Sequence, residues 1–225
     1  MRSGSRRVAA VLFGATGVLA AACLAACGGK SPTSPSSPSA PADPGVTLPS
    51  LESMMADKTI GSAAAPITMI EYSSLSCSHC ADFHSQTLPQ IRSNYIDPGQ
   101  VRLIYRDYPL DDGVTLAASM VARCSGDRFF TVIDLLYRSQ AAWSRSPNAA
   151  SALKSAVAPS GMSGTEVDAC LARTDLRLAI QAMKAEGEST FGVTGTPTFI
   201  INTSRKVIGA YPYATFASVF QDLLK

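Results

Sequence analysis

Two cysteines, Cys77 and Cys80, stand where an apolar segment gives way to a helical pattern. The apolar residues 67–72 before them suit a buried strand, and residues 81–92 after them carry large apolar side chains at helical spacing. A cysteine at a helix start faces unpaired backbone N–H groups and the positive end of the helix dipole, which both favour thiolate over thiol. A strand, a Cys-x-x-Cys pair and a helix together indicate a redox-active dithiol in an α/β fold.

Two other interpretations of the cysteine pair are a structural disulfide and part of a metal site. A structural zinc site needs four ligands, whereas Cys77, Cys80 and His84 supply three and no second cluster follows in the sequence. Covalent haem attachment requires histidine directly after the second cysteine, and position 81 is alanine. We therefore expect neither a metal nor a cofactor.

Composition sets the class of protein. The chain has 225 residues, of which 46% are hydrophobic, enough for one packed domain. Its formal net charge of +2 and the absence of a basic patch give no reason to expect binding to nucleic acid. Six cysteines that include a Cys-x-x-Cys pair fit a protein that works where disulfides persist.

The N-terminal residues indicate export. Residues 1–26 begin with arginines and continue as an uncharged run, as in a secretory signal peptide. Residues 24–28, Leu-Ala-Ala-Cys-Gly, resemble the bacterial lipobox, which predicts cleavage before Cys27 and a lipid on that cysteine; an uncleaved membrane helix and soluble secretion are the alternatives. Residues 27–53 are rich in serine and proline and predict an extended tether. We expect a lipid-anchored protein on the extracytoplasmic side of a bacterial cell envelope, at the periplasmic side or the cell surface.

The remaining residues, 54–225, predict one folded domain. Its elements are a strand at 67–72, a helix at 81–92, a strand at 101–110, a helical block at about 112–189, strands at 191–202 and 206–210, and a closing helix at 215–224. This order predicts an α/β domain with a helical insertion between its second and third core strands.

Four segments together resemble the DsbA-like thiol:disulfide oxidoreductases of the thioredoxin superfamily. They are Pro-Ile-Thr-Met-Ile-Glu-Tyr at 66–72, the Cys-x-x-Cys, Val-Arg-Leu-Ile-Tyr-Arg-Asp-Tyr-Pro-Leu at 101–110, and Val-Thr-Gly-Thr-Pro-Thr-Phe at 193–199. The resemblance covers about residues 59–225 and implies a thioredoxin fold that carries a helical insertion. The family's usual Cys-Pro-His-Cys is Cys-Ser-His-Cys here, and Ser78 therefore bears on the redox potential.

The catalytic roles follow from the helix start and from the resemblance. Cys77 is expected to be the exposed attacking thiol, and Cys80 the buried partner that resolves the mixed disulfide. His79 either pairs with the Cys77 thiolate or is an exposed turn residue. His84 is expected on the helix surface.

Three residues near the pair are further candidates. Glu71 is either a buried carboxylate that shuttles the proton of Cys80, as the resemblance implies, or a strand-end residue that faces water. Thr196 and Pro197 match the superfamily's cis-proline loop, whose backbone can pair with an extended substrate segment. The alternative is a trans proline at a strand start.

Cys124 and Cys170 both fall in the helical block. A structural disulfide between them fits an exported domain, and two free buried thiols are the alternative. A bond between them closes a long loop of the chain, which constrains the unfolded state.

These observations predict an enzyme, a thiol:disulfide oxidoreductase that donates its disulfide to exported proteins with cysteines. A membrane redox partner is expected to reoxidise or reduce the pair. A reductase or isomerase with the same residues is one alternative, although residues 28–54 hold no room for a dimerisation domain, and we expect a monomer. The other is a non-enzymatic lipoprotein that binds a metal or another substrate on a thioredoxin fold.

Overall fold

The computed structural model describes residues 45–225. The predicted signal peptide, the predicted lipidation site at Cys27 and the first part of the predicted tether lie outside the described residues. The described part contains a mixed five-stranded sheet in the order β1-β3-β2-β4-β5. Its strands are β1 (Lys58–Ile60), β2 (Ile67–Ser73), β3 (Val101–Asp107), β4 (Thr198–Ile201) and β5 (Arg205–Ile208).

Strand β2 lies inside the sheet and leads to the cysteine pair. It runs parallel to β3 and antiparallel to β4, so that Glu71 is the register partner of Tyr105 on one side and of Phe199 on the other. Since both faces of the sheet are covered, β2 is apolar along most of its length, as in other strands buried on both faces. Because β2 is the third of the five strands, its C-terminal end and the cysteines after it lie at the centre of the sheet, on the side where the parallel strands β2 and β3 end.

The helix after the cysteines is longer than the predicted 81–92. It begins as α2 (Ser78–Asp82), passes through a π-helical turn at Phe83–Thr87, continues as α3 (Leu88–Ile91), and ends in a second π-helical turn at Arg92–Ile96. Pro89 lies near the start of α3. Because proline lacks the N–H that the regular helical ladder requires, the helix accommodates it beside the first π-helical turn.

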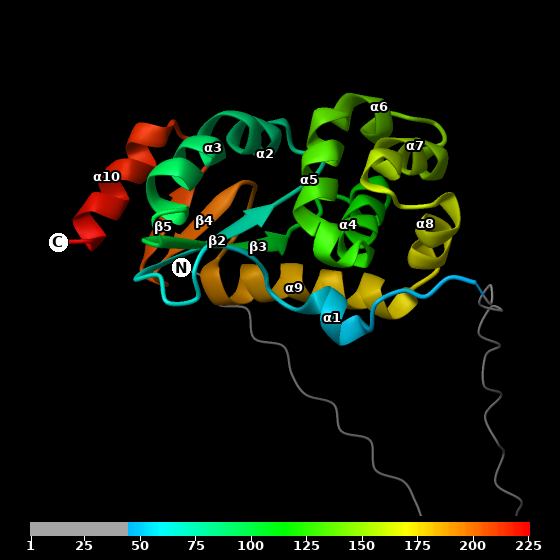
Figure 1. Cartoon of the computed structure of the whole chain (residues 1–225), viewed down its shortest axis with the longest axis horizontal. Helices are drawn as coiled ribbons and strands as arrows, with labels where there is room; N and C mark the ends of the chain where they lie inside the picture. The colour runs from blue at the N-terminus through cyan, green and yellow to red at the C-terminus, as the bar shows by residue number, and fades with distance from the viewer. Residues whose placement is uncertain (1–44) are drawn as a thin grey trace, which may run out of the picture. The chain divides into compact units, whose positions relative to one another are not determined.

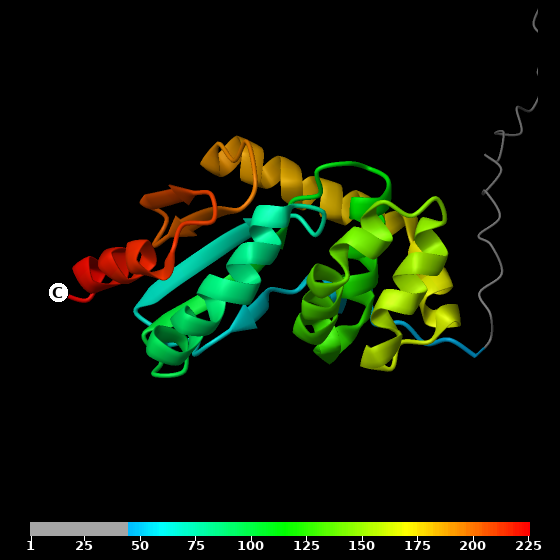
Figure 2. The ribbon, with the colours of Figure 1, turned by 90° about the horizontal axis from the view of Figure 1, so that it is seen from above.

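Helices cover both faces of the sheet (Figures 1 and 2). The helix after the cysteines and α10 (Tyr213–Leu223) pack on one face, where Phe83, Met69 and Phe216 belong to one apolar core. Helix α9 (Thr174–Phe191) covers the other face. There a Cβ atom on Gly187 would lie 2.5 Å from a ring carbon of Tyr72, so glycine is what permits the close approach of helix and sheet.

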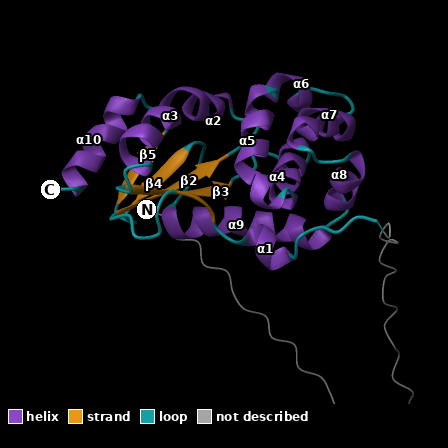
Figure 3. Ribbon diagram, in the orientation of Figure 1, coloured by secondary structure: helices purple, strands orange, loops and turns teal. Residues whose placement is uncertain are grey.

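The helical insertion lies between β3 and β4. It consists of α4 (Val114–Cys124), α5 (Phe129–Arg138), α6 (Gln140–Ser144), α7 (Ala149–Val157), α8 (Gly164–Leu171) and α9. Its helices α4 to α8 form the end of the described domain away from the sheet, and α9 returns along the sheet (Figure 3). The predicted core strands correspond to β2, β3, β4 and β5, because β1 was not among them. The insertion therefore lies between the second and third core strands, which confirms the predicted α/β fold. No helix within residues 45–225 has the length and apolar character needed to cross a membrane.

Two short elements differ from the sequence-based prediction. Strand β1 was not expected, because its three residues are too few to show an alternating pattern. Helix α1 (Leu51–Met55) begins before the predicted domain boundary at residue 54 and so extends into the predicted tether, because Ser50 caps the helix and Met54 is buried.

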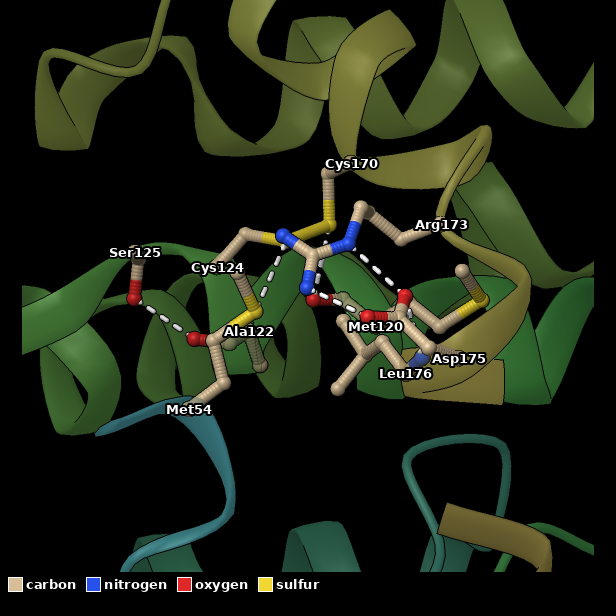
Figure 4. Close-up of a disulfide and its surroundings, with 9 residues drawn as sticks. All are labelled: Met54, Met120, Ala122, Cys124, Ser125, Cys170, Arg173, Asp175 and Leu176. Atoms are coloured by element: carbon tan, nitrogen blue, oxygen red, sulfur yellow. Dashed lines mark hydrogen bonds and ion pairs between the residues drawn. A yellow bond between two sulfur atoms is a disulfide. The ribbon is translucent and has the colours of Figure 1, made fainter. Parts of the chain in front are cut away.

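A disulfide joins Cys124 on α4 to Cys170 on α8 (Figure 4). The two Cα atoms are 6.1 Å apart and the bond spans a sequence separation of 46. The sulfur of Met54 lies 3.8 Å from that of Cys124, which places helix α1 directly against the disulfide.

A buried ion pair connects the same region to the sheet. Arg123, the residue before the disulfide, donates from Nε to Oδ2 of Asp107 at 2.7 Å, and neither side chain is exposed. Its Nη1 also donates to the carbonyl groups of Met54 at 3.0 Å and Ala56 at 3.2 Å. One guanidinium therefore holds together the end of β3, helix α4 and the chain around α1.

Candidate active site

Cys77 and Cys80 lie at the junction between β2 and α2, and both are free thiols in the structure. Cys77 is the N-cap residue of α2 and is half-buried, whereas Cys80 is fully buried. The backbone N–H groups of His79 and Cys80 interact with the Cys77 sulfur. The Cys77 thiol donates to the carbonyl oxygen of Thr196 at 3.4 Å, which joins the helix start to the loop before β4.

The two thiols have opposite acidities. A hydrogen bond from the Cys80 thiol is the largest cause that lowers the pKa of Cys77 to about 5; burial opposes it, and Thr196 and the backbone N–H groups add to it. Burial is the largest cause that raises the pKa of Cys80, followed by the hydrogen bond to Cys77 and the charge of its thiolate. The pair therefore carries one negative charge, on the accessible sulfur, as a nucleophilic thiolate requires.

The Thr196–Pro197 peptide bond is cis. The carbonyl of Pro197 accepts from the backbone N–H of Gly209 at 2.8 Å, which fixes the loop to the turn after β5. The Thr196 hydroxyl is buried and has no hydrogen-bond partner. It is thus free to donate to the Cys77 thiolate once the thiol, which here donates to the carbonyl, has lost its proton.

His79 contributes to the site through its backbone. Its imidazole is 72% exposed and lies 4.0 Å from the carboxylate of Asp82. The interaction that lowers the pKa of Cys77 comes from the His79 N–H group. A pairing of the imidazole with the thiolate stays a prediction.

Glu71 and His84 form a buried pair beneath the helix. Nε2 of His84 lies 2.9 and 3.1 Å from the two carboxylate oxygens of Glu71. The Glu71 side chain is 0% exposed and that of His84 is 9% exposed. The expectation that His84 lies on the helix surface was wrong, because the insertion places the ring of Tyr137 over this face of the helix, with ring centroids 4.6 Å apart. Within residues 45–225 no three or more metal-ligating side chains form a cluster suited to a metal ion.

The insertion supplies residues that sequence reasoning missed. The Gln140 amide donates to the carbonyl oxygens of Leu75 at 2.7 Å and Cys77 at 3.0 Å, and so holds the loop that carries the attacking cysteine. The Tyr137 hydroxyl lies 2.8 Å from that of Ser73, at the end of β2. Both residues come from helices far along the chain, and no motif surrounds them.

Comparison with known proteins agrees with this geometry. The thioredoxin family model matches residues 53–222. The chain belongs to the thioredoxin family. Among curated members, a Rickettsia bellii protein, whose name describes it as a protein-disulfide oxidoreductase, is 28% identical over 148 residues; the match covers 65% of this chain and 57% of the relative. The chain thus spans little more than half the length of that relative.

Solved structures of thioredoxin-family proteins also resemble the chain. Wolbachia pipientis alpha-DsbA1 is 29% identical, with a TM-score of 0.69, and the match covers 75% of this chain and 90% of that one. A protein-disulfide isomerase from Novosphingobium aromaticivorans has a TM-score of 0.64 at 24% identity, with 75% of this chain and 98% of that chain covered. At that identity the second likeness supports the fold alone, whereas the first supports the predicted resemblance to DsbA-like proteins.

Proposed function

We propose that this protein is a thiol:disulfide oxidoreductase that donates the Cys77–Cys80 disulfide to exported proteins with cysteines. The observation that carries the proposal is the arrangement of the pair, in which a half-buried, acidic Cys77 lies against the cis-proline loop and a buried Cys80 lies behind it. The names of the Rickettsia relative and of the Wolbachia structure support the same reaction class.

The reaction proceeds through two thiol exchanges. A substrate thiolate attacks the Sγ of Cys77; a substrate–Cys77 disulfide forms, the Cys77–Cys80 bond breaks, and Cys80 leaves as a thiolate that takes up a proton. A second substrate thiolate then attacks the substrate sulfur of this mixed disulfide. Cys77 leaves as a thiolate, which its low pKa stabilises, and two electrons have passed from the substrate to the pair.

The cis-proline loop is the proposed binding site for the substrate backbone. Thr196 and Pro197 lie beside the Cys77 sulfur, where an extended segment around the substrate cysteine has to lie during attack. The substrate therefore binds mainly through its backbone, which suits an enzyme that acts on many sequences.

We place the enzyme on the outer side of the cytoplasmic membrane, held by a lipid on Cys27. The Cys124–Cys170 disulfide fits such a compartment, since structural disulfides persist where the surroundings are oxidising. A membrane redox partner returns the Cys77–Cys80 pair to the disulfide after each turnover.

The reduction potential of the pair, equilibrated against glutathione, tests the direction of transfer. A potential well above that of glutathione is expected for a disulfide donor, and a potential near that of thioredoxin would instead make the protein a reductase. Cys77→Ser is expected to abolish exchange with a cysteine-containing peptide. The matched variant Cys80→Ser is expected to accumulate the mixed disulfide, and a protein that forms none would be a binding protein rather than an enzyme.

A further inference from the structure

The two halves of the active site are attached to different parts of the described domain. Leu75 is fully buried in the core of the insertion, and Cys77 packs against the same core. The cis-proline loop lies between Val193 and Phe199, which belong to two other cores. The contact of 3.4 Å between the Cys77 sulfur and the carbonyl oxygen of Thr196 therefore crosses a boundary between cores. Whatever fixes the Cys77 loop to the insertion also fixes this distance.

Gln140, at the start of α6, joins the insertion directly to the loop that carries Cys77. A glutamine amide nitrogen has two hydrogens, and that of Gln140 donates to the carbonyl oxygens of Leu75 at 2.7 Å and Cys77 at 3.0 Å. Helix α6 is itself anchored, because Trp143 is fully buried in the core of the insertion and its Nε1 donates to the carbonyl of Leu136 at 2.7 Å. The loop is thus tied to a residue on a fixed support.

The Cys77 carbonyl has a second partner. It accepts from the backbone N–H of Ala81 at 3.2 Å, which is a helical hydrogen bond of α2. Two donors on this oxygen fix the plane of the peptide bond after Cys77, and with it the direction of the first helical turn, whose N–H groups at His79 and Cys80 interact with the Cys77 sulfur. The position of the sulfur opposite the cis-proline loop therefore depends on Gln140 as well as on the helix.

We propose that Gln140 is a positioning residue that holds the Cys77 sulfur in register with the cis-proline loop, so that the pair reacts faster with cysteines in polypeptides than with small thiols. This inference rests on the proposed function. A substrate segment that pairs with the backbone of the loop brings its cysteine to one place. Attack on the disulfide is fast only where the Cys77 sulfur lies within reach of that place, since a misplacement of about 1 Å can lower a rate by about a hundredfold. A thiol without a peptide backbone does not depend on this register.

The test compares the rates at which two thiols reduce the oxidised protein: a cysteine-containing peptide and 2-mercaptoethanol, which has no backbone. Gln140→Met keeps the length of the side chain and removes both donors. Gln140→Glu keeps the shape of the side chain but turns a carboxylate toward two carbonyl oxygens. We expect the ratio of the peptide rate to the 2-mercaptoethanol rate to fall by about tenfold in Gln140→Met, the upper worth of one hydrogen bond, and by more in Gln140→Glu.

Gln181, on α9, offers matched control variants. Its amide donates to Oδ1 of Asp112 at 3.1 Å, in a contact that involves neither the cysteines nor the cis-proline loop. Gln181→Met and Gln181→Glu make the same chemical changes as the two Gln140 variants. They are expected to keep the rate ratio of the unmodified protein, even where their free energy of unfolding falls as much as that of the Gln140 variants.

The rate ratio separates positioning from a general structural role. Folded Gln140 variants with an unaltered ratio would overturn the inference, and so would an equal fall in both rates, which a general weakening of the thiol pair produces. An unmodified protein without a preference for the peptide would overturn it too, while leaving the proposed function intact. An unmodified protein that reacts with neither thiol would refute the proposed function itself.

Discussion

The acidity of Cys77 predicts that the reduced protein loses stability in acid by more than the oxidised protein does. The pKa of Cys77 is about 5 in the folded protein, against an ordinary value of 9.0. A group whose folded pKa is depressed contributes stability that is fully present above its unfolded pKa and is lost as the pH falls through its folded pKa. The oxidised protein has no Cys77 thiol to titrate.

The contribution of the Cys77 thiolate to the free energy of unfolding follows from the interval between its folded pKa and the working pH. Between about pH 5 and pH 7, each pH unit adds about 1.36 kcal/mol, which sets an upper bound of about 2.7 kcal/mol. The sulfur is half-exposed, so solvent screening lowers the expected contribution to about 1.5 kcal/mol. Because this energy stabilises only the reduced form, it raises the reduction potential of the pair by about 30 mV.

The assay is urea unfolding of the reduced and oxidised proteins at a series of pH values, with the thiolate followed by its ultraviolet absorbance. The difference between the two free energies of unfolding isolates Cys77, because carboxylates titrate in both forms. Reduced Cys77→Ser is expected to follow the pH dependence of the oxidised protein. Parallel loss of stability in the reduced and oxidised proteins below neutral pH would refute the reasoning.

Three further predictions concern the free energy of unfolding, measured in urea. Replacing Cys124 and Cys170 by alanine is expected to cost about 4 kcal/mol, because the disulfide spans a sequence separation of 46; an unchanged midpoint would contradict it. Arg123→Met leaves a buried carboxylate unpaired and is expected to cost about 3–5 kcal/mol, so a variant as stable as the unmodified protein would show that the ion pair is dispensable. Gly187→Ala is expected to destabilise by about 1–3 kcal/mol despite the better helix propensity of alanine, because its Cβ meets the Tyr72 ring at 2.5 Å; a gain in stability would mean that the ring moves aside.

The sequence was sufficient to predict the secondary structure around the cysteine pair, where local periodicity and a motif coincide. The apolar run before Cys77 and the helical spacing after Cys80 predicted a strand and a helix at that site, and both are present. The helical insertion could be predicted because it lacks strand patterns over a long stretch. The helix boundaries inside this block were not predicted: α8 ends at Leu171 and α9 begins at Thr174, although the helical pattern of residues 165–183 continues across this point.

Contacts between distant segments could not be predicted. Whether Glu71 is buried depends on what covers the end of β2, and that cover comes from α5, whose own pattern indicates only an amphipathic helix. The same contact decides the position of His84, which local spacing placed at the surface. Tyr137 and Gln140 carry no motif, and their roles arise only from the packing of the insertion on the active-site loop.

The attachment of α1 determines how mechanical load enters the domain. Leu48 and Leu51 pack on the core of the insertion, and Arg123 donates hydrogen bonds to the backbone carbonyl groups of Met54 and Ala56. A pull on the chain at its N-terminal side is therefore borne by the insertion, whose helices α4 and α8 are covalently cross-linked. Cys77 packs on the same core, and Gln140 of α6 donates to the carbonyl groups of its loop, so the cross-linked helices that bear such a pull also support the thiol pair.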